Sequence, residues 1–122
     1  MGLQPVSIEN PFSRGKSFGK LLAYLIADVA IVASNNVDHP LFFRDGVNGV
    51  LAPNDVDRWV EGTALLLQDP AQRSDIVANA RAGLQARLTT AVAAELVGKV
   101  LLDAIQAGDW SAPYPLAAPS HV

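Results

Sequence analysis

The chain has 122 residues, half of them hydrophobic and 17% charged, which suits one domain with a packed core and argues against disorder. A formal net charge of −3 argues against a general nucleic-acid binder. The sequence contains no cysteine, which excludes disulfides and thiolate metal sites. No apolar run approaches the roughly 20 residues of a transmembrane helix, and residues 1–10 lack the basic start and apolar block of a secretory signal, so we expect a cytoplasmic protein.

The first predicted elements are a strand, a loop and a helix. Val6 and Ile8 alternate with polar residues, which is typical of a short strand. The turn formers of residues 10–16 predict a loop, and Ser17 after them is the expected N-cap of a helix. Apolar residues then recur at helical spacing: Phe18, Leu21, Leu22, Leu25 and Ile26.

The middle of the chain predicts two more strands. The continuous apolar run Val29–Ala33 is typical of a strand that is buried on both faces, as in parallel sheets. Leu41–Phe43 predicts a helical turn. Asp45-Gly46 and Asn48-Gly49 both favour positive φ and predict a tight turn before a strand at Val50–Ala52. We therefore expect an α/β fold in which these two strands pair in parallel.

Two further helices are predicted next. Asn54 is the expected N-cap of the first. Its apolar face consists of Val56, Trp59, Val60, Thr63 and Leu67. Asp69 and Pro70 have the order of an N-cap and a first helical residue. The second helix carries its apolar residues on one side: Ile76, Val77, Ala80 and Leu84.

The end of the chain predicts a last helix and a tail. Thr89 or Thr90 begins the helix, which Gly108 ends. From Asp109 onward the chain is rich in proline and poor in core formers. We therefore expect a partial domain at residues 1–108 and a C-terminal tail at residues 109–122.

The segment Arg14–Lys20 has the composition of a phosphate-binding turn. A helix N-terminus presents free amides and partial positive charge, and Gly15 allows the backbone to approach an anion closely. Positive charge to balance the anion comes from Arg14, Lys16 and Lys20. Ser17 is the expected start of the helix whose free amides would bind the anion. A solvated loop with ordinary surface lysines explains the same residues equally well, so both interpretations stay open.

A P-loop is a weaker interpretation of the same residues. Gly15-Lys16-Ser17 imitates the end of the GxxxxGK[ST] motif, but the first glycine of that motif would fall on Asn10. The buried strand that ends at Ala33-Ser34 also lacks an acidic residue for magnesium.

The histidines predict neither a metal site nor a catalytic set. His39 lies in a predicted loop and His121 in the predicted tail, and neither has a second ligand at metal spacing. We interpret both as surface histidines, and no Ser-His-Asp triad can be assembled from them. Trp59 lies at an apolar helical position and is interpreted as a core residue.

Four stretches share an order and spacing with one enzyme family: Arg14–Tyr24, Val29–Ser34, Phe43–Leu51, and Leu66–Arg73 followed by Asn79–Arg81. They resemble the KSxxKxxEY donor-site helix, the xPVVAS strand, the IxDGxNGxL turn and the LLxDPxxR and NAR helices of group 1 glycosyltransferases. These enzymes have the GT-B fold. The resemblance runs from Pro11 to about Ile105.

The resemblance implies a truncated Rossmann-like fold, the C-terminal half of GT-B, with a short parallel sheet flanked by helices. It implies that a nucleotide-sugar donor binds through its diphosphate, without a metal or cofactor, for transfer to a glycan or lipid-linked acceptor. The donor-binding residues implied are Arg14, Gly15, Lys16, Ser17 and Lys20. None of them is a catalytic residue.

The chain also departs from the family pattern. The two glutamates usual in the family's donor site fall on Gly15 and Ala23, so a hydrogen-bond acceptor for the ribose is missing. Asp28 stands where the family has glycine, and Ala30 where it has proline. Without an acceptor domain, we expect the isolated chain to be inactive. A degenerate, non-catalytic binding or assembly module of the same fold is the alternative, and unpaired sheet edges favour a homodimer.

Overall fold

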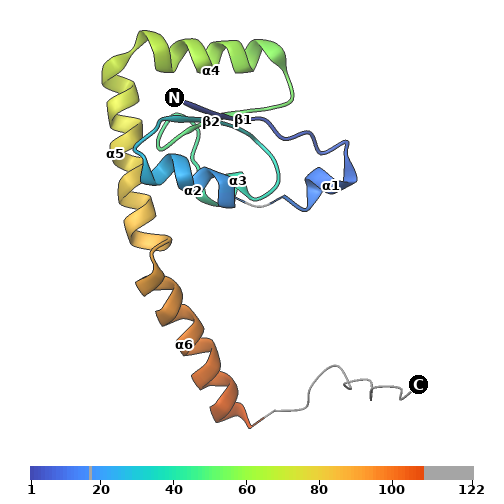
Figure 1. The fold of residues 1–122 in the computed structure, drawn as a ribbon, viewed down its shortest axis with the longest axis vertical. Helices are drawn as coiled ribbons and strands as arrows, with labels where there is room; N and C mark the ends of the chain where they lie inside the picture. The colour runs from blue at the N-terminus through green and yellow to red at the C-terminus, as the bar shows by residue number, and fades with distance from the viewer. Residues whose placement is uncertain (17, 109–122) are drawn as a thin grey trace, which may run out of the picture. The chain divides into compact units, whose positions relative to one another are not determined.

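The computed structural model describes residues 1–16 and 18–108 and contains a parallel sheet flanked by helices (Figure 1). The three strands lie in the order β1-β2-β3: β1 (Gly2–Gln4), β2 (Ile31–Ser34) and β3 (Val50–Ala52). The helices are α1 (Pro11–Arg14), α2 (Gly19–Ile26), α3 (His39–Phe42), α4 (Val56–Gln68), α5 (Pro70–Arg87) and α6 (Thr90–Ala107). The chain divides into two compact units, Met1–Leu88 and a second unit that begins at Thr89.

The predicted parallel pairing is confirmed. Val32 lies opposite Val50 in the β2–β3 pair, and Leu3 lies opposite Val32 in the β1–β2 pair. A mixed α/β fold with a short parallel sheet is therefore the architecture of the first unit. β2 begins two residues later than the predicted run, at Ile31.

The position of the first strand was predicted wrongly. β1 is Gly2–Gln4, and Val6 and Ile8 follow it in irregular structure. Val6 is buried, but its N–H donates to the Ser34 hydroxyl at 2.7 Å, whereas Ile8 is exposed. The Ser34 hydroxyl at the end of β2 thus accepts the Val6 N–H, which a backbone carbonyl would accept if Val6 were paired in the sheet.

The helix boundaries largely follow the predicted caps. The side chains of Asp69 and Thr89 accept hydrogen bonds from the N–H groups of Gln72 and Val92. Gly108 ends α6 in the left-handed region, at a φ of 65°. The N-cap of α4 is Asp55, not Asn54, because its carboxylate accepts the Arg58 N–H at 3.1 Å.

The loop predicted at residues 10–16 contains one helical turn, α1. Asn10 caps this turn by accepting the Phe12 N–H at 2.9 Å, and Pro11 occupies its first position. The predicted N-cap Ser17 lies outside the described residues. Phe18 occupies the N-cap position of α2, and no side chain of its own caps the helix.

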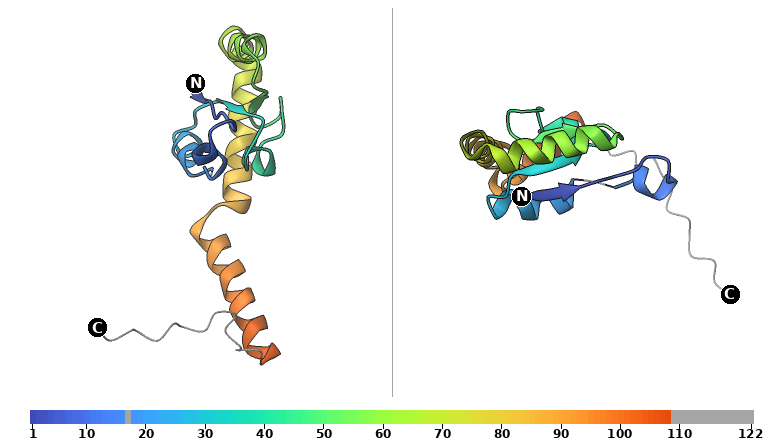
Figure 2. Two further views of the ribbon diagram at one scale, coloured as in Figure 1. Left: turned by 90° about the vertical axis from the view of Figure 1, so that its right-hand side faces the viewer. Right: turned by 90° about the horizontal axis from the view of Figure 1, so that it is seen from above.

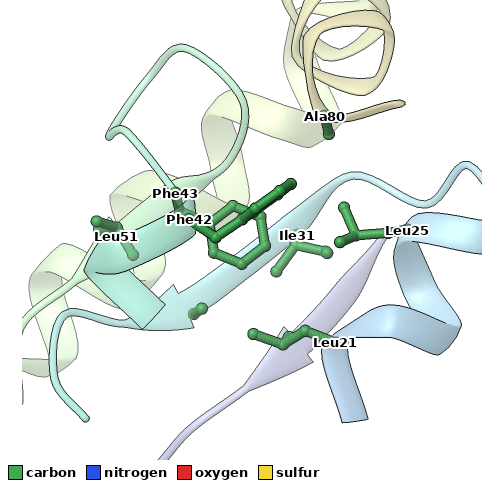
Figure 3. Packing of buried hydrophobic residues seen from close by; sticks show 8 residues of the cluster. Leu21, Leu25, Ile31, Phe42, Phe43, Leu51 and Ala80 are labelled. Atoms are coloured by element: carbon green, nitrogen blue, oxygen red, sulfur yellow. The ribbon is translucent and has the colours of Figure 1, made fainter. Parts of the chain in front are cut away.

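Alternate residues of the sheet face two hydrophobic clusters. On one face, Ile31, Ala33 and Leu51 pack with α2 and α3, and Figure 3 shows Leu21 and Leu25 reaching from α2 toward Ile31. On the other face, α4 covers the sheet through a second cluster: Ala30, Val32, Val50, Ala52, Leu66 and Ile76. This alternation follows from the two-residue repeat of a strand.

The helix α5 contributes to both clusters. It passes the end of the sheet where the strands begin, whereas α1 lies at the opposite end (Figures 1 and 2). Ala80 packs into the first cluster and Ile76 into the second. The predicted apolar side of this helix is therefore confirmed, with Val77 and Leu84 partly buried.

The predicted core face of α4 is wrong. Val56, Val60 and Leu67 are exposed, and the buried residues are Gly62 and Leu66. A Cβ at Gly62 would lie 2.7 Å from Cγ1 of Val50, so the helix approaches the sheet most closely on its glycine side. Trp59 lies between the two faces, half-buried against the second cluster.

The second unit is described here through α6 alone. Its 18 residues follow the Thr89 cap, and none of their side chains is buried. No described helix has the length and apolarity needed to span a membrane. The predicted tail, residues 109–122, lies outside the described residues together with His121, and the predicted boundary at residue 108 stays a prediction.

Candidate functional site

The candidate site lies where the three strands end, which is the edge of a parallel sheet that usually binds ligands. Two connections meet there, residues 5–18 after β1 and residues 35–38 after β2. The Asn36 side-chain amide donates to the Val6 carbonyl at 2.8 Å, and the Val6 N–H donates to the Ser34 hydroxyl. These two bonds hold the connections together.

His39 is a buried residue, which corrects its interpretation as a surface histidine. It is 1% exposed, and its Nδ1 lies 2.8 Å from the Ser34 carbonyl oxygen. A carbonyl oxygen can only accept, so Nδ1 carries the proton and donates it. The ring therefore fastens the start of α3 to the end of β2. The described residues contain no cluster of three potential metal ligands.

A carboxylate lies against the N-terminus of α2. Asp38 accepts the Phe18 N–H through Oδ2 at 2.9 Å. Such a contact is favourable because the first amides of a helix are unpaired and carry partial positive charge. The other carboxylate oxygen, Oδ1, and the Oδ1 atom of Asn36 are buried without a hydrogen-bond partner among the described residues. Asp38 thus occupies part of the space expected for an anion.

The backbone between these two side chains is strained. Val37 has a φ of 48°, in the left-handed region that β-branched residues avoid. Its neighbours Asn36 and Asp38 both make hydrogen bonds to the connection after β1, and these bonds hold the unfavourable conformation. Strain of this kind often accompanies ligand sites. Val37 also lines a shallow hollow of about 430 Å³ with Ile8, Glu9 and Arg14.

The predicted phosphate-binding residues lie on the connection that leads into α2. Arg14 ends α1, and its Nε donates to the Ile8 carbonyl at 2.8 Å. Gly15 follows as the C-cap of α1. The Lys16 ammonium lies 5.7 Å from the centre of the Phe12 ring, and Lys20 lies in the first turn of α2.

The charged side chains of this segment are exposed to solvent. Arg14, Lys16 and Lys20 are all exposed, as is Ala23, where the family pattern has a glutamate. Ser17 lies outside the described residues. The described residues of the segment therefore offer positive charge next to a helix N-terminus, and Arg14 also lines the hollow beside Val37.

The turn between α3 and β3 is tied into the fold by its side chains. Asp45 accepts the Leu51 N–H at 2.8 Å. Asn48 accepts the Arg44 N–H at 2.6 Å and donates to the Phe42 carbonyl at 3.1 Å. These polar groups bind backbone groups of the turn and its flanks, which agrees with the tight turn predicted from Asp45-Gly46 and Asn48-Gly49.

The two glycines of this turn serve different purposes. Gly46 has a φ of 71°, as predicted. Gly49 does not have positive φ, which corrects that part of the prediction. It is needed for space, because a Cβ there would lie 2.5 Å from Cδ1 of Phe43.

The NAR stretch also stabilises the fold. The Asn79 side-chain amide donates to the Val47 carbonyl at 3.0 Å and so holds the turn. Arg81 forms an ion pair with Asp28, which has a φ of 54° at the end of α2. Glycine adopts this left-handed region without strain, whereas a residue with a Cβ does so less readily.

The stretches that carry the resemblance thus differ in what their polar side chains do. Asp45, Asn48, Asn79 and Arg81 make contacts within the fold, whereas Lys16 and Lys20 remain exposed beside the N-terminus of α2. A second hollow, of about 570 Å³, is apolar and lies on α4 and β1, without any of the predicted site residues. Comparison with models of protein families, with curated proteins and with solved structures finds no match to this chain.

Proposed function

We propose that this chain is the donor-binding part of a group 1 glycosyltransferase of the GT-B type and binds the diphosphate of a nucleotide sugar. The sugar would go to a glycan or lipid-linked acceptor held by another domain. One observation carries the proposal: the connection from the edge strand β1 to α2 leaves the carboxyl end of a parallel sheet, and Arg14, Lys16 and Lys20 lie where it enters α2. The order of the four resembling stretches supports it.

The chemistry of binding follows from this position. The Gly19 and Lys20 amides begin α2 and suit a phosphate oxygen, while the Lys16 and Lys20 ammonium groups supply countercharge. Asp38 opposes this binding, since its carboxylate already holds the Phe18 amide and repels an anion. We therefore expect weak binding that salt weakens further, because the lysines are exposed.

Selectivity among nucleotides should be low. The exposed side chain of Ala23 offers no acceptor for a ribose hydroxyl. Gly15 likewise lacks a carboxylate. These departures, together with the Asp38 contact, favour a second candidate function: a non-catalytic module that keeps the fold and has lost donor binding.

An amide-shift titration of the full chain separates the two candidates. Uridine diphosphate and guanosine diphosphate should both shift amides near Gly19 and Lys20. Lys16→Ala and Lys20→Ala should each weaken binding by roughly two- to fivefold, which corresponds to the worth of one exposed charge at a helix terminus. The matched control is Lys99→Ala, which removes an exposed lysine of α6 and should leave the affinity unchanged.

Asp38→Asn sharpens the same experiment. It removes a negative charge while it keeps an oxygen that can accept the Phe18 N–H. Diphosphate affinity should therefore rise, and the rise should shrink in high salt. Shifts centred elsewhere, or unchanged by both lysine substitutions, would remove this segment as the donor site. A complete lack of shifts would favour the non-catalytic module.

A further inference from the structure

Large apolar side chains of α6 are exposed in the part of the chain that the structure describes. None of its side chains is buried among the described residues. Six large apolar residues are each more than half exposed: Leu96, Val97, Val100, Leu101, Leu102 and Ile105. In the first unit, by contrast, Leu21, Val32 and Leu66 are fully buried. An apolar helix of this length needs a partner to become stable in water.

The charged residues of α6 are confined to one stripe. Glu95, Lys99 and Asp103 follow each other at intervals of four residues, so they lie on one side of the helix. Val97 and Leu101 lie on the opposite side, because each residue turns the helix by about 100°. A partner can therefore cover the apolar side while all three charges stay in water. No charge has to be desolvated by the contact.

The exposed area is close to what a stable protein interface uses. Six side chains that are each more than half exposed present on the order of 600 Å². The alanines on the same side bring the surface near the roughly 800 Å² that each partner contributes to a standard interface. Monomeric proteins seldom leave an apolar patch of this size uncovered.

We propose that copies of this chain associate through α6. Each copy presents the same apolar side of α6. When two copies meet about a two-fold axis, the apolar side of each therefore covers that of the other. The apolar side is wider than the seam of a two-stranded coiled coil, which favours a bundle of α6 helices with a dimer as the smallest form. A membrane surface fits less well, because membrane-surface helices have basic polar faces and this stripe has two acids and one lysine.

Sedimentation velocity and light scattering of the full chain test the proposal at concentrations from 1 to 100 µM, on the order of those used for such assemblies. We expect a dimer or larger species. Leu101→Asp should produce a monomer, and Leu101→Ala, which keeps the helix, should raise the dissociation constant at least about tenfold. The matched control is Gln106→Asp, since Gln106 lies on the charged side and its replacement should leave the assembly intact.

Three results would overturn the proposal. The first is a wild-type chain that stays monomeric throughout this range. The second is association that survives Leu101→Asp but is lost in Leu3→Asp, which would place the contact at the free edge of β1. The third is a monomer that binds phosphatidylserine vesicles through α6, which would make the partner a membrane. Diphosphate binding plays no part in these outcomes, so they are independent of the donor site.

Discussion

The turn at residues 45–49 and the segment at residues 14–20 both contain glycines and polar side chains, and both lead into a regular element. They differ in where their side chains are used. In the turn, Asp45 and Asn48 bind backbone groups. In the segment, Lys16 and Lys20 are exposed. A motif therefore does not reveal by its composition whether it stabilises the fold or binds a ligand, and the contacts decide.

The largest expected effect compares one glycine from each region, Gly49 and Gly15. Gly49→Ala should lower the free energy of unfolding by about 1–3 kcal/mol, because the added Cβ meets the Phe43 ring at 2.5 Å. That ring packs against Phe18 and Phe42 and has little room to move. Gly15→Ala is the matched control, since its Cβ would meet only the Phe12 carbonyl at 3.8 Å.

Urea unfolding measures both variants, and Gly15→Ala should change stability by less than about 0.5 kcal/mol. Equal losses of stability in Gly49→Ala and Gly15→Ala would mean that the turn at residues 45–49 is packed no more tightly around its glycine than the segment at residues 14–20.

The next largest effect concerns the asparagine of the turn. Asn48→Ala should cost about 1–2 kcal/mol, because it removes an exposed hydrogen bond to the Arg44 N–H and a partly buried one to the Phe42 carbonyl. Asn54→Ala is its control, since Asn54 is exposed and Asp55 caps α4 in its place. The unfolding midpoint of the control should match that of the wild type. A loss at Asn54 as large as that at Asn48 would contradict the assignment.

A smaller effect is expected for the ion pair of Asp28 and Arg81. Both side chains are more than a third exposed, so Arg81→Ala should cost no more than about 1 kcal/mol. In the Arg81→Ala variant, Asp28→Gly should then stabilise the chain by about 0.5 kcal/mol, since glycine adopts positive φ without strain. Thermal unfolding of the two single variants, Arg81→Ala and Asp28→Gly, and of the double variant measures these changes in stability. A further loss in the double variant would show that Asp28 has another stabilising partner.

The smallest effect on stability is expected in the basic segment. Lys20→Ala should change the free energy of unfolding by less than about 0.5 kcal/mol, because the side chain is exposed. Lys16→Ala should cost no more than about 1 kcal/mol, the value of its exposed contact with the Phe12 ring. Chemical denaturation of the two variants used in the diphosphate titration provides the measurement. A larger loss in either variant would make its lysine a structural residue.

Local signals were enough to predict much of the fold. The apolar run before Ser34 predicted a buried strand, and the Val50–Ala52 strand and its parallel pairing were predicted correctly. Asp69 was predicted as a cap, and the last helix was predicted to begin at Thr89 or Thr90, because a helix start depends on side-chain and backbone groups a few residues apart. The position of the basic segment before α2 followed from the same local chemistry. Periodicity and capping are properties of neighbouring residues, so sequence alone determines them.

Other features were decided only by contacts between distant residues. β1 contains Gly2, whose place in the sheet depends on the Ala30 carbonyl and on the Tyr24 ring beside it. The buried face of α4 was set by the approach of Gly62 to Val50, against the helix's own apolar pattern.

The candidate site depends on tertiary structure in the same way. Asp38 reaches the Phe18 amide across 20 positions of sequence, and His39 is buried because its ring binds the end of β2. No local pattern records that a carboxylate already lies at the N-terminus of α2. The sequence alone predicted an anion at the start of α2, and this stays a prediction. Only the fold shows that the Asp38 carboxylate lies at the same place, because folding brings together residues that are 20 positions apart.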